Sequence, residues 1–339
     1  MNQVLSAEAA MARAIERARL GLGKTFPNPI VGAVITSATG EFISEGFHQG
    51  ADHAEVIAIK AAKEIPAGSI IYVSLEPCNH HGKTPPCVDA IINAGISKVI
   101  YAVSDPNPVA SGGADHLKAA GIEVISGLNE IQARYENRAW LTKIEKQRSR
   151  ITWKIASTMD GKVAASDGSS KWITGELSRA DVALMRSKSD AIVTSTATVK
   201  ADDPLLTSKG AGSNPVRIVM GTTEIASDSK VLGNDSETVL IKSHDFKDLI
   251  KVANERGFNQ LMIEAGPTLG TALLRADLID EIVLFQAPTF LGAGLSAIGD
   301  LGITNIAGRL DFEISDVEVI GADLKITLVK SSNAERGAI

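Results

Sequence analysis

The chain has 339 residues, which is more than one hydrophobic core usually serves, so two domains are expected. Its 44% hydrophobic and 22% charged residues form an ordinary globular composition, and 34 basic against 40 acidic residues give a net charge of −6. Because basic residues do not cluster and no apolar run approaches the ~18 residues of a membrane span, we expect neither a nucleic-acid nor a membrane partner.

The first half alternates apolar runs with helical patterns. Residues 1–20 predict an amphipathic helix rather than a signal peptide, because charges interrupt the apolar positions, and we therefore expect a cytoplasmic protein. Strands are predicted at 28–36, 41–49, 69–77, 97–105 and 122–127, and helices at 53–65, at 85–95 and around 114–121. This alternation predicts a mostly parallel sheet with helices on its faces.

The second half begins after a long charged helix that we expect over 128–148. A new strand follows at 150–158, so the domains are predicted to be 1–148 and 149–339. Further strands are expected at 190–196, 215–221, 238–243, 260–266 and 280–288, with helices at 178–189, 246–257 and 271–280. Residues 310–330 alternate like an antiparallel hairpin at a sheet edge, which completes a second α/β domain.

The stretch EPCNHHGKTPPC, residues 76–87, contains both cysteines of the chain, Cys78 and Cys87. A disulfide is one interpretation, but cytoplasmic thiols stay reduced. A metal site is the other, although two cysteines are too few ligands. His53, at the start of a predicted helix, would complete a His/Cys/Cys set whose fourth position is left for water, which is typical of a catalytic zinc.

Glu55, two residues after His53, gives this set a chemical purpose. Zinc deaminases carry H-x-E followed by P-C-x-x-C, with the glutamate as general acid/base, and Pro77 and Cys78 fit that order. Here eight residues separate the cysteines instead of two. The pattern favours a catalytic zinc over a lone packed histidine, while a zinc-stabilised binding module without catalysis remains an alternative.

The longer cysteine spacing resembles that of the bifunctional pyrimidine deaminase/reductase family of riboflavin biosynthesis. NPIVGAV (28–34), GFHQGADHAE (46–55) and SDPNP (104–108) match the same family, and the resemblance covers nearly the whole chain. It implies a cytidine-deaminase-like three-layer domain followed by a dihydrofolate-reductase-like α/β domain. In the deaminase pocket it implies substrate contacts from Asn28, His48, Lys83, Asp105 and Asn107, whereas we expect His80 and His81 to shape the loop.

The second domain is similar to the reductase half of this family in KIASTMDGK (154–162) and SSKWIT (169–174). IEAGPTLG (263–270) predicts a strand, a turn at Gly266 and a helix that starts near Pro267. Backbone amides at such a helix start can hold a phosphate, but composition alone leaves an ordinary strand–turn–helix equally open. Thr158 and Met159 replace the family's usual serine and leucine, Lys209 replaces an arginine, and Gly221 and Thr222 replace an Asp-Ser pair.

The resemblance carries two further sets of residues over to this chain. On the substrate side it implies Lys154, Ser170, Arg186, Leu206, Lys209 and Glu264. For the nicotinamide cofactor it implies Ala156, Trp172, Thr198, Asp202, Thr222, Gly266, Pro267, Thr268, Leu269, Gly270 and Thr271.

Together these features predict a two-step enzyme with one Zn²⁺ per chain and NADPH as its cofactors. The first domain would deaminate 2,5-diamino-6-(5-phosphoribosylamino)pyrimidin-4-one, and the second would reduce the ribosyl group of the product to ribityl. The expected partner is this small pyrimidine ribose phosphate, and the resemblance implies a homo-oligomer built through the reductase domains. A nucleoside or RNA-base deaminase with an unrelated second domain is the alternative, which the acidic charge and the reductase motifs oppose.

Overall fold

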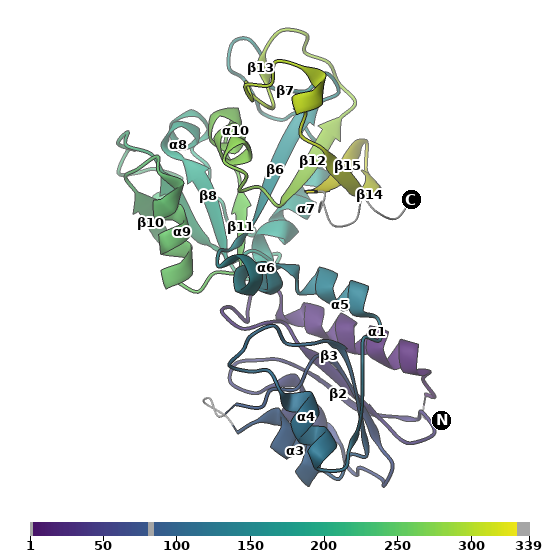
Figure 1. Ribbon diagram of the computed structural model, residues 1–339. Coiled ribbons are helices and arrows are strands. Elements are labelled where there is room, and N and C mark those ends of the chain that lie inside the picture. Colours follow the sequence, from purple (N-terminus) through teal and green to yellow (C-terminus); the bar gives the residue numbers. More distant parts are fainter. Residues whose placement is uncertain (1–2, 81–84, 331–339) are drawn as a thin grey trace. The chain divides into compact units, whose positions relative to one another are not determined.

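The protein is described by a computed structural model that covers residues 3–80 and 85–330. Two compact units make up the chain, Met1–Arg148 and Ser149–Ile339 (Figure 1). No helix within the described ranges is long and apolar enough to cross a membrane.

The first unit is built on a five-stranded sheet. Strand β1 is antiparallel to both of its neighbours, whereas β3, β4 and β5 run parallel, so the predicted mostly parallel sheet is a mixed one. The reason is the short turn between β1 and β2, which leaves no room for a crossover helix. The strands lie in the order β2 (Phe42–Phe47), β1 (Gly32–Thr36), β3 (Ile70–Leu75), β4 (Lys98–Val103) and β5 (Glu123–Ser126).

Helices cover both faces of this sheet and give it three layers. Alternate strand residues point to opposite faces, so that Ile71 and Val73 pack with α2 (Ala54–Ala61), α3 (Cys87–Asn93) and α4 (Gly113–Ala119). Tyr72 points the other way and packs with α1 (Ala7–Ala18) and with the helices that follow β5.

The single helix predicted over 128–148 is wrong. Two helices, α5 (Glu130–Glu136) and α6 (Arg138–Lys146), meet at Asn137. The buried Asn137 side chain donates from Nδ2 to the Ile30 carbonyl at 2.6 Å and accepts from the Ile30 amide at 3.0 Å. Because the Asn137 side chain pairs with both backbone groups of Ile30, it holds the α5–α6 junction against the segment that leads into β1.

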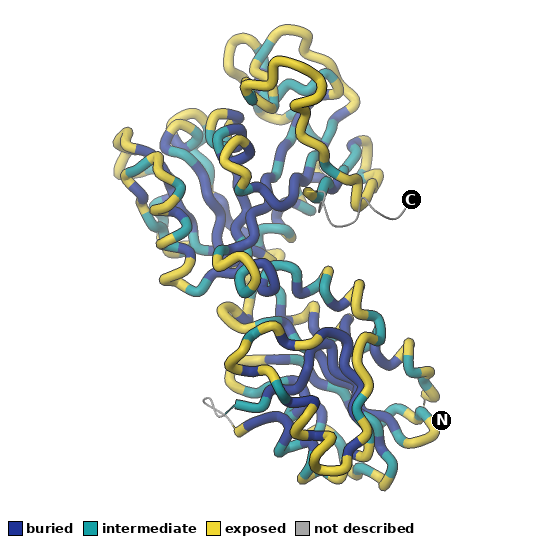
Figure 2. The backbone as a smooth tube through the Cα atoms, in the orientation of Figure 1, coloured by how far each residue is buried: buried dark blue, intermediate teal, exposed yellow. Residues whose placement is uncertain are grey.

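The second unit contains an eight-stranded sheet whose central strands β8, β9 and β11 are mostly buried, dark blue in Figure 2, whereas the edge strand β14 is mostly exposed. Six strands run parallel, and the last two form an antiparallel hairpin at the edge, as predicted. The order is β10 (Thr238–Ile241), β9 (Val216–Met220), β8 (Ala191–Ser195), β11 (Gln260–Ile263), β6 (Arg150–Thr158), β12 (Glu281–Ala287), β15 (Asp323–Lys330) and β14 (Phe312–Ile320).

Helices α7 (Glu176–Ser187), α8 (Thr196–Asp202), α9 (Phe246–Glu255) and α10 (Pro267–Arg275) flank this sheet, and β7 (Lys162–Ala164) pairs with β13 (Leu295–Ser296) beside it. Helix α8 is not predicted from the sequence, because its short, threonine-rich stretch shows no helical periodicity. The Ser195 hydroxyl accepts from the Thr198 amide and caps this helix. The helix expected over 271–280 begins at Pro267 and ends at Arg275, since Asp277 takes a left-handed backbone conformation (φ 62°).

Candidate functional sites

The first unit brings His53, Cys78 and Cys87 together. His53 caps the start of α2, Cys78 follows β3, and Cys87 begins α3. His53 Nδ1 lies 3.1 Å from Cys87 Sγ and 3.5 Å from Cys78 Sγ, and all three ligand atoms lie within 4.8 Å of one another. A tetrahedral zinc ion with ordinary bond lengths separates its ligands by about 3.6 Å, so one nitrogen and two sulfurs at these distances fit zinc. Both cysteines are free thiols, which removes the disulfide interpretation.

The hydrogen bonds among these three side chains shift their pKa values. Hydrogen bonds with Cys87 and His53 lower the pKa of Cys78 to about 4, while the same bond to Cys78 and burial raise the pKa of Cys87. The hydrogen bond to Cys78 also raises the pKa of His53. The lowered pKa of Cys78 favours its thiolate form, which metal binding requires.

Glu55 lies in the first turn of α2 and is 3% exposed. Burial is the largest influence on this carboxyl and raises its pKa to about 7, with a further contribution from the Cys78 charge. A buried carboxyl beside the proposed metal ligands, and not among them, is placed for proton transfer.

Two more of the predicted pocket residues lie next to His53. The His48 ring is buried, with its centroid 5.3 Å from that of His53 in an edge-to-face arrangement. Asn28 is exposed, and its Nδ2 lies 3.4 Å from His48 Nε2. Burial, and then the nearby His53 charge, lower the pKa of His48, so its ring is neutral at pH 7 and suits hydrogen bonding to a polar ring.

Asp105 and Asn107 follow the end of β4. Asp105 is buried, and burial together with the charges of Glu76 and Cys78 raises its pKa to about 6 against the opposing hydrogen bond from the Asn107 amide. That amide donates to Asp105 Oδ1 at 2.8 Å. Lys83 and His81 lie outside the described residues, whereas His80 of the same loop is described and half-buried.

The second unit brings Lys154, Arg186 and Glu264 into one cluster. Glu264, directly after β11, accepts from Arg186 Nε on Oε1 at 2.5 Å and from Arg186 Nη2 on Oε2 at 2.9 Å. Lys154 Nζ lies 3.1 Å from the same Oε2. Burial alone would raise the pKa of Glu264, but the Lys154 and Arg186 charges outweigh it and hold the pKa at about 2. The site therefore holds a fixed carboxylate between two cations, with a net positive charge.

The chain after α8 supplies the other predicted substrate residues. Leu206 is buried and Lys209 exposed, and both take left-handed backbone conformations, with φ of 54° and 49°. Arg186 reaches this segment, because its Nη1 donates to the Thr207 carbonyl at 3.0 Å. The Ser170 hydroxyl donates to Oδ1 of Asp202, a predicted cofactor residue, at 3.4 Å.

Thr198, Thr222 and Gly266 follow the carboxyl ends of the parallel strands β8, β9 and β11, where open α/β sheets bind their ligands. The Thr198 hydroxyl accepts from the Gly266 amide at 3.2 Å and so joins α8 to the start of α10. Thr222 lies after β9, with its hydroxyl 3.3 Å from His244 Nε2. Trp172 is 69% exposed with the Arg179 guanidinium over its ring, and Ala156 is half-buried on β6.

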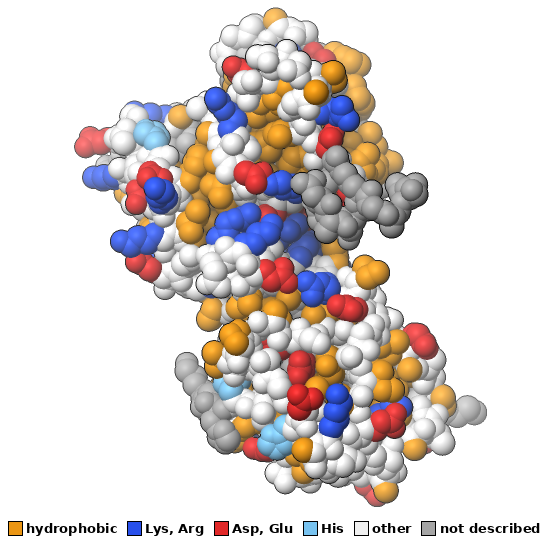
Figure 3. Space-filling model, in the orientation of Figure 1, with side chains coloured by type: hydrophobic (Ala, Val, Ile, Leu, Met, Phe, Trp, Pro, Cys, Tyr) orange, Lys and Arg blue, Asp and Glu red, His pale blue; other side chains and the backbone are white. Residues whose placement is uncertain are grey.

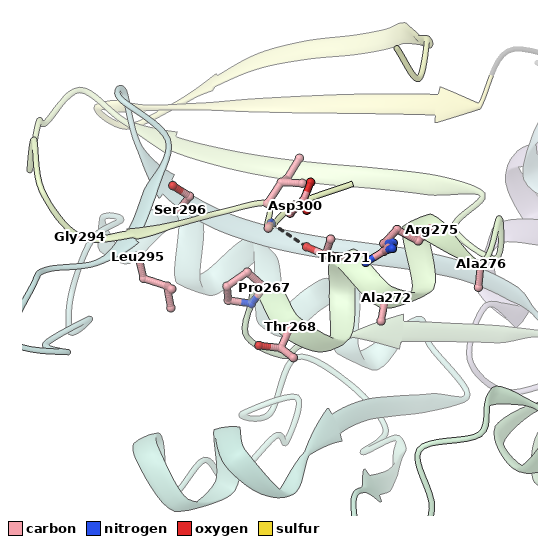
Figure 4. Close-up of a pocket in the computed structure, with 12 residues that line it drawn as sticks. Pro267, Thr268, Thr271, Ala272, Arg275, Ala276, Gly294, Leu295, Ser296 and Asp300 are labelled. Atoms are coloured by element: carbon pink, nitrogen blue, oxygen red, sulfur yellow. Dashed lines mark hydrogen bonds between the residues drawn. The ribbon is translucent and has the colours of Figure 1, made fainter. Parts of the chain in front are cut away.

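The first turns of α10 line a pocket of about 850 Å³ (Figure 4). Pro267, Thr268 and Thr271 face it, and the Thr271 hydroxyl accepts from the Gly299 amide at 2.8 Å. Leu269 and Gly270 face inward instead, since Leu269 packs against the core and a Cβ on Gly270 would lie 2.1 Å from Trp153. Only the backbone of those two residues is available to a cofactor.

The opposite wall of this pocket was not identified from the sequence. It is the segment 294–300, with Leu295, Ser296 and Asp300 among its lining residues, and Arg275 lies at the far end of α10. A small-residue stretch between two apolar runs, GAGLSAIGD, is the signal that marks it.

Comparisons with known proteins divide the chain in a similar way. Residues 5–103 match the cytidine and deoxycytidylate deaminase zinc-binding region, and residues 149–326 match the RibD C-terminal domain. The riboflavin biosynthesis protein RibD of Mycobacterium tuberculosis (strain ATCC 25618 / H37Rv) is 42% identical over 337 residues, covering 97% of this chain and 99% of that protein. RibD of Escherichia coli (strain K12) is 38% identical, covering 94% and 98%.

Solved structures match nearly the whole chain. The diaminohydroxyphosphoribosylaminopyrimidine deaminase/5-amino-6-(5-phosphoribosylamino)uracil reductase of Thermotoga maritima superposes with a TM-score of 0.89 at 32% identity, covering 96% of this chain and 98% of that one. RibD of Acinetobacter baumannii gives 0.89 at 35% identity, covering 96% and 99%. The predicted fold class, a deaminase-like domain followed by a reductase domain, is confirmed.

Proposed function

The chain belongs to the RibD family of riboflavin biosynthesis, whose members carry a deaminase and a reductase domain, and from this premise we propose the substrates and the residues of both steps. Residues 1–148 deaminate 2,5-diamino-6-(5-phosphoribosylamino)pyrimidin-4-one to 5-amino-6-(5-phosphoribosylamino)uracil. Residues 149–339 then reduce the ribosyl group of that product to ribityl with NADPH. The observation that carries the proposal is the buried Glu55 beside a His/Cys/Cys group in the same chain as the Lys154–Glu264–Arg186 cluster.

His53, Cys78 and Cys87 hold one zinc ion per chain in this proposal. Two thiolates neutralise the charge of the ion, which suits a group in which both cysteines are buried. When bound, zinc makes a water molecule acidic enough to act as a nucleophile near neutral pH. Cys78 and Cys87 must stay reduced to bind zinc, and thiols stay reduced in the cytoplasm. We therefore infer a cytoplasmic location.

Glu55 moves the proton in the deamination. Its carboxylate takes a proton from water as the water oxygen bonds to the ring carbon that bears the amino group. It delivers that proton to the amino group, so that the C–N bond breaks and ammonia leaves, while the second water proton ends on the ring nitrogen. The pyrimidine is held by hydrogen bonds from Asn28, His48, Asp105 and Asn107, while Lys83 pairs with the ribose phosphate. An amide, a neutral imidazole and a carboxyl offer the mix of donors and acceptors that the edge of a polar ring needs.

Lys154, Ser170, Arg186, Leu206, Lys209 and Glu264 bind the substrate of the reduction. Glu264 orients Lys154 through their ion pair, and it engages one edge of the Arg186 guanidinium. Because Arg186 also holds the Thr207 carbonyl, it orients the segment that carries Leu206 and Lys209. The positive balance of the cluster suits a substrate with a phosphate group.

NADPH is the hydride donor, and its phosphates lie at the start of α10. Thr268 and Thr271 offer hydroxyls there, and the backbone from Gly266 to Gly270 offers amides at the positive end of the helix dipole. Ala156, Trp172, Thr198, Asp202 and Thr222 complete the cofactor contacts.

A homo-oligomer formed through the reductase domains is part of the proposal. On β14, the side chains of Ile314, Val317 and Val319 are 66%, 52% and 76% exposed. They face the same side as Ile326 and Leu328 of the paired strand β15. Figure 3 shows hydrophobic side chains gathered at this edge of the unit. An apolar face on an edge strand is typical of a surface that another chain covers.

Product analysis tests the function directly. Purified protein is incubated with the diaminopyrimidine ribose phosphate, with and without NADPH, and products are identified by mass. The expected result is ammonia and the deaminated pyrimidine without cofactor, and the ribityl compound after NADPH is added. A deaminated nucleoside or RNA base, with no NADPH consumption, would instead support the alternative deaminase.

A further inference from the structure

Glu76 is a buried glutamate that is not among the proposed metal, substrate or cofactor residues. It follows the last residue of β3, precedes Pro77 and Cys78, and is 8% exposed. Within the described part of the chain, none of the ion pairs involves it, so backbone groups rather than a cation stabilise it. A buried carboxylate without hydrogen bonds would be strongly unfavourable, and its partners therefore indicate what it organises.

Those partners are two amides from separate segments. Glu76 Oε2 accepts from the Asp105 amide at 3.1 Å, and Oε1 accepts from the Ala114 amide at 3.0 Å. Ala114 lies in the first turn of α4, whose capping residue, Gly112, has no side chain to offer. One carboxylate thus joins the end of β3 to the start of α4 and to the segment after β4.

The fixed segment is the one that carries two proposed substrate contacts. From Asp105 the hydrogen bonds continue, because its Oδ1 accepts from the Asn107 amide at 2.8 Å and the Asn107 side chain accepts from the Val109 amide at 3.2 Å. The start of α4 also packs closely against the residue after Glu76, since a Cβ on Gly113 would lie 1.9 Å from the Pro77 carbonyl oxygen. Small displacements of Glu76 would therefore reach both Asp105 and Asn107.

We propose that Glu76 is a positioning residue of the deaminase pocket, which sets the affinity for the pyrimidine by fixing the Asp105–Asn107 segment without touching substrate or metal. The inference rests on the proposed function for the role of Asp105 and Asn107. The contacts require a carboxylate, since both amides need an acceptor. A glutamine offers one oxygen and one NH₂ group, so one of the two amides would face another donor.

Glu76→Gln in the full-length, zinc-loaded protein tests this. The KM for the diaminopyrimidine is expected to rise at least tenfold while kcat changes less than threefold, with one zinc per chain retained and reduction of the deaminated substrate unchanged. Glu45→Gln is the matched control, because Glu45 is a partly buried glutamate of the same unit that pairs with Arg13 and Arg17 instead of backbone amides. Its KM is expected to stay at the unmodified value. Loss of zinc in Glu76→Gln, or an equal KM rise in the control, would overturn the proposal.

A double-mutant cycle with Asp105→Ala shows whether Glu76 acts through this segment. In that background the effect of Glu76→Gln on KM should shrink to threefold or less. A raised KM in Asp105→Ala together with an unmodified KM in Glu76→Gln overturns the positioning role and leaves the proposed function standing. An unmodified KM in both variants removes Asp105 from the substrate site and the positioning role with it. Should Glu76→Gln not fold, Glu76→Asp, whose shorter side chain reaches one amide at most, carries the same cycle.

Discussion

At the scale of single residues, Glu55 differs from the three metal ligands in its proposed role, because it transfers a proton and does not bind zinc. Replacing it with glutamine keeps the shape of the side chain but removes its ability to accept and release a proton. We expect Glu55→Gln to lower deamination by at least ~100-fold. Zinc content, measured by metal analysis, should stay at one per chain, and reduction of the already deaminated substrate should persist. Near-normal ammonia release from this variant would show that another group transfers the proton.

Glu264 makes the second unit sensitive to acid. Its folded-state pKa of about 2 lies below its ordinary value of 4.5. The ionised Glu264 carboxylate, held by Lys154 and Arg186, therefore stabilises the fold fully above pH ~4.5. This stabilisation is lost as pH falls from about 4.5 towards 2, and at ~1.4 kcal/mol per pH unit it is on the order of 3 kcal/mol. Glu264→Gln should remove the acid sensitivity over this window and destabilise the unit by roughly 3 kcal/mol at neutral pH, because Lys154 and Arg186 lose their buried partner.

The free energy of unfolding of the unmodified protein and of Glu264→Gln, measured with urea between pH 3 and pH 7, checks this prediction. Arg256 and Glu237 form an exposed pair in the same unit, with Nη2 2.7 Å from Oε1, and provide the control. Glu237→Gln should change stability by less than ~1 kcal/mol at every pH. The assignment fails if Glu264→Gln retains the pH dependence of the unmodified protein.

At the scale of elements, the start of α10 offers a matched pair of glycines. Gly266 has an ordinary extended backbone, and a Cβ there would meet no atom within 4 Å, so the fold tolerates a side chain that the cofactor phosphates would not. Gly266→Val should raise the Kd for NADPH at least tenfold, with zinc content and deamination unchanged. Gly270→Ala should instead destabilise the unit, because its Cβ would overlap the Trp153 ring. Titration of NADPH by fluorescence and thermal unfolding separate the two effects, and unchanged affinity in Gly266→Val would make this turn merely structural.

Elements with a strong local pattern are those that the sequence predicts well. Strand β6 and the β14–β15 hairpin alternate or run apolar over many residues, and both lie where expected. Helix α8 and the break at Asn137 depend on single side-chain contacts, a cap from Ser195 and a pairing with Ile30 that lies 107 residues away. Periodicity carries no information on such contacts, so these two features were missed.

The same distinction holds for the sites. His53, Glu55, Cys78 and Cys87 form a motif whose order is visible in the chain. The contact between Arg186 and Glu264 spans 78 residues, and that between Glu76 and Asp105 spans 29, so neither partner can be identified until the strands are placed. Family resemblance supplied Arg186 and Glu264 as separate residues, whereas their pairing required the fold.

At the scale of the whole molecule, the apolar face of β14 and β15 predicts self-association. A charge at its centre would oppose a covered interface, so Val317→Glu should shift the protein towards the monomer in sedimentation analysis, with secondary structure unchanged. Glu313→Lys alters charge on the opposite face of the same strand and should leave the assembly intact. If both variants sediment like the unmodified protein, this face is not the interface.

The two units are expected to work independently, because each has its own core. Within the described residues, every core cluster belongs to one unit, with those of the second starting at Ile151. A fragment from residue 149 also keeps its first residues anchored, since the Ser149 hydroxyl donates to the Phe258 carbonyl and the Arg150 amide donates to the Asn259 carbonyl, both at 2.8 Å.

This fragment, residues 149–339, should consume NADPH with the deaminated substrate at a rate within about threefold of the full chain, since the Lys154–Glu264–Arg186 cluster and the start of α10 lie entirely inside it. The complementary experiment removes zinc from the full chain with a chelator. Deamination should stop and return when zinc is restored, because the ligands His53, Cys78 and Cys87 all lie in the first unit, while NADPH consumption should continue throughout. A folded fragment that binds NADPH but reduces nothing, or a chelated chain that loses both activities, would mean that the reduction depends on residues of the first unit.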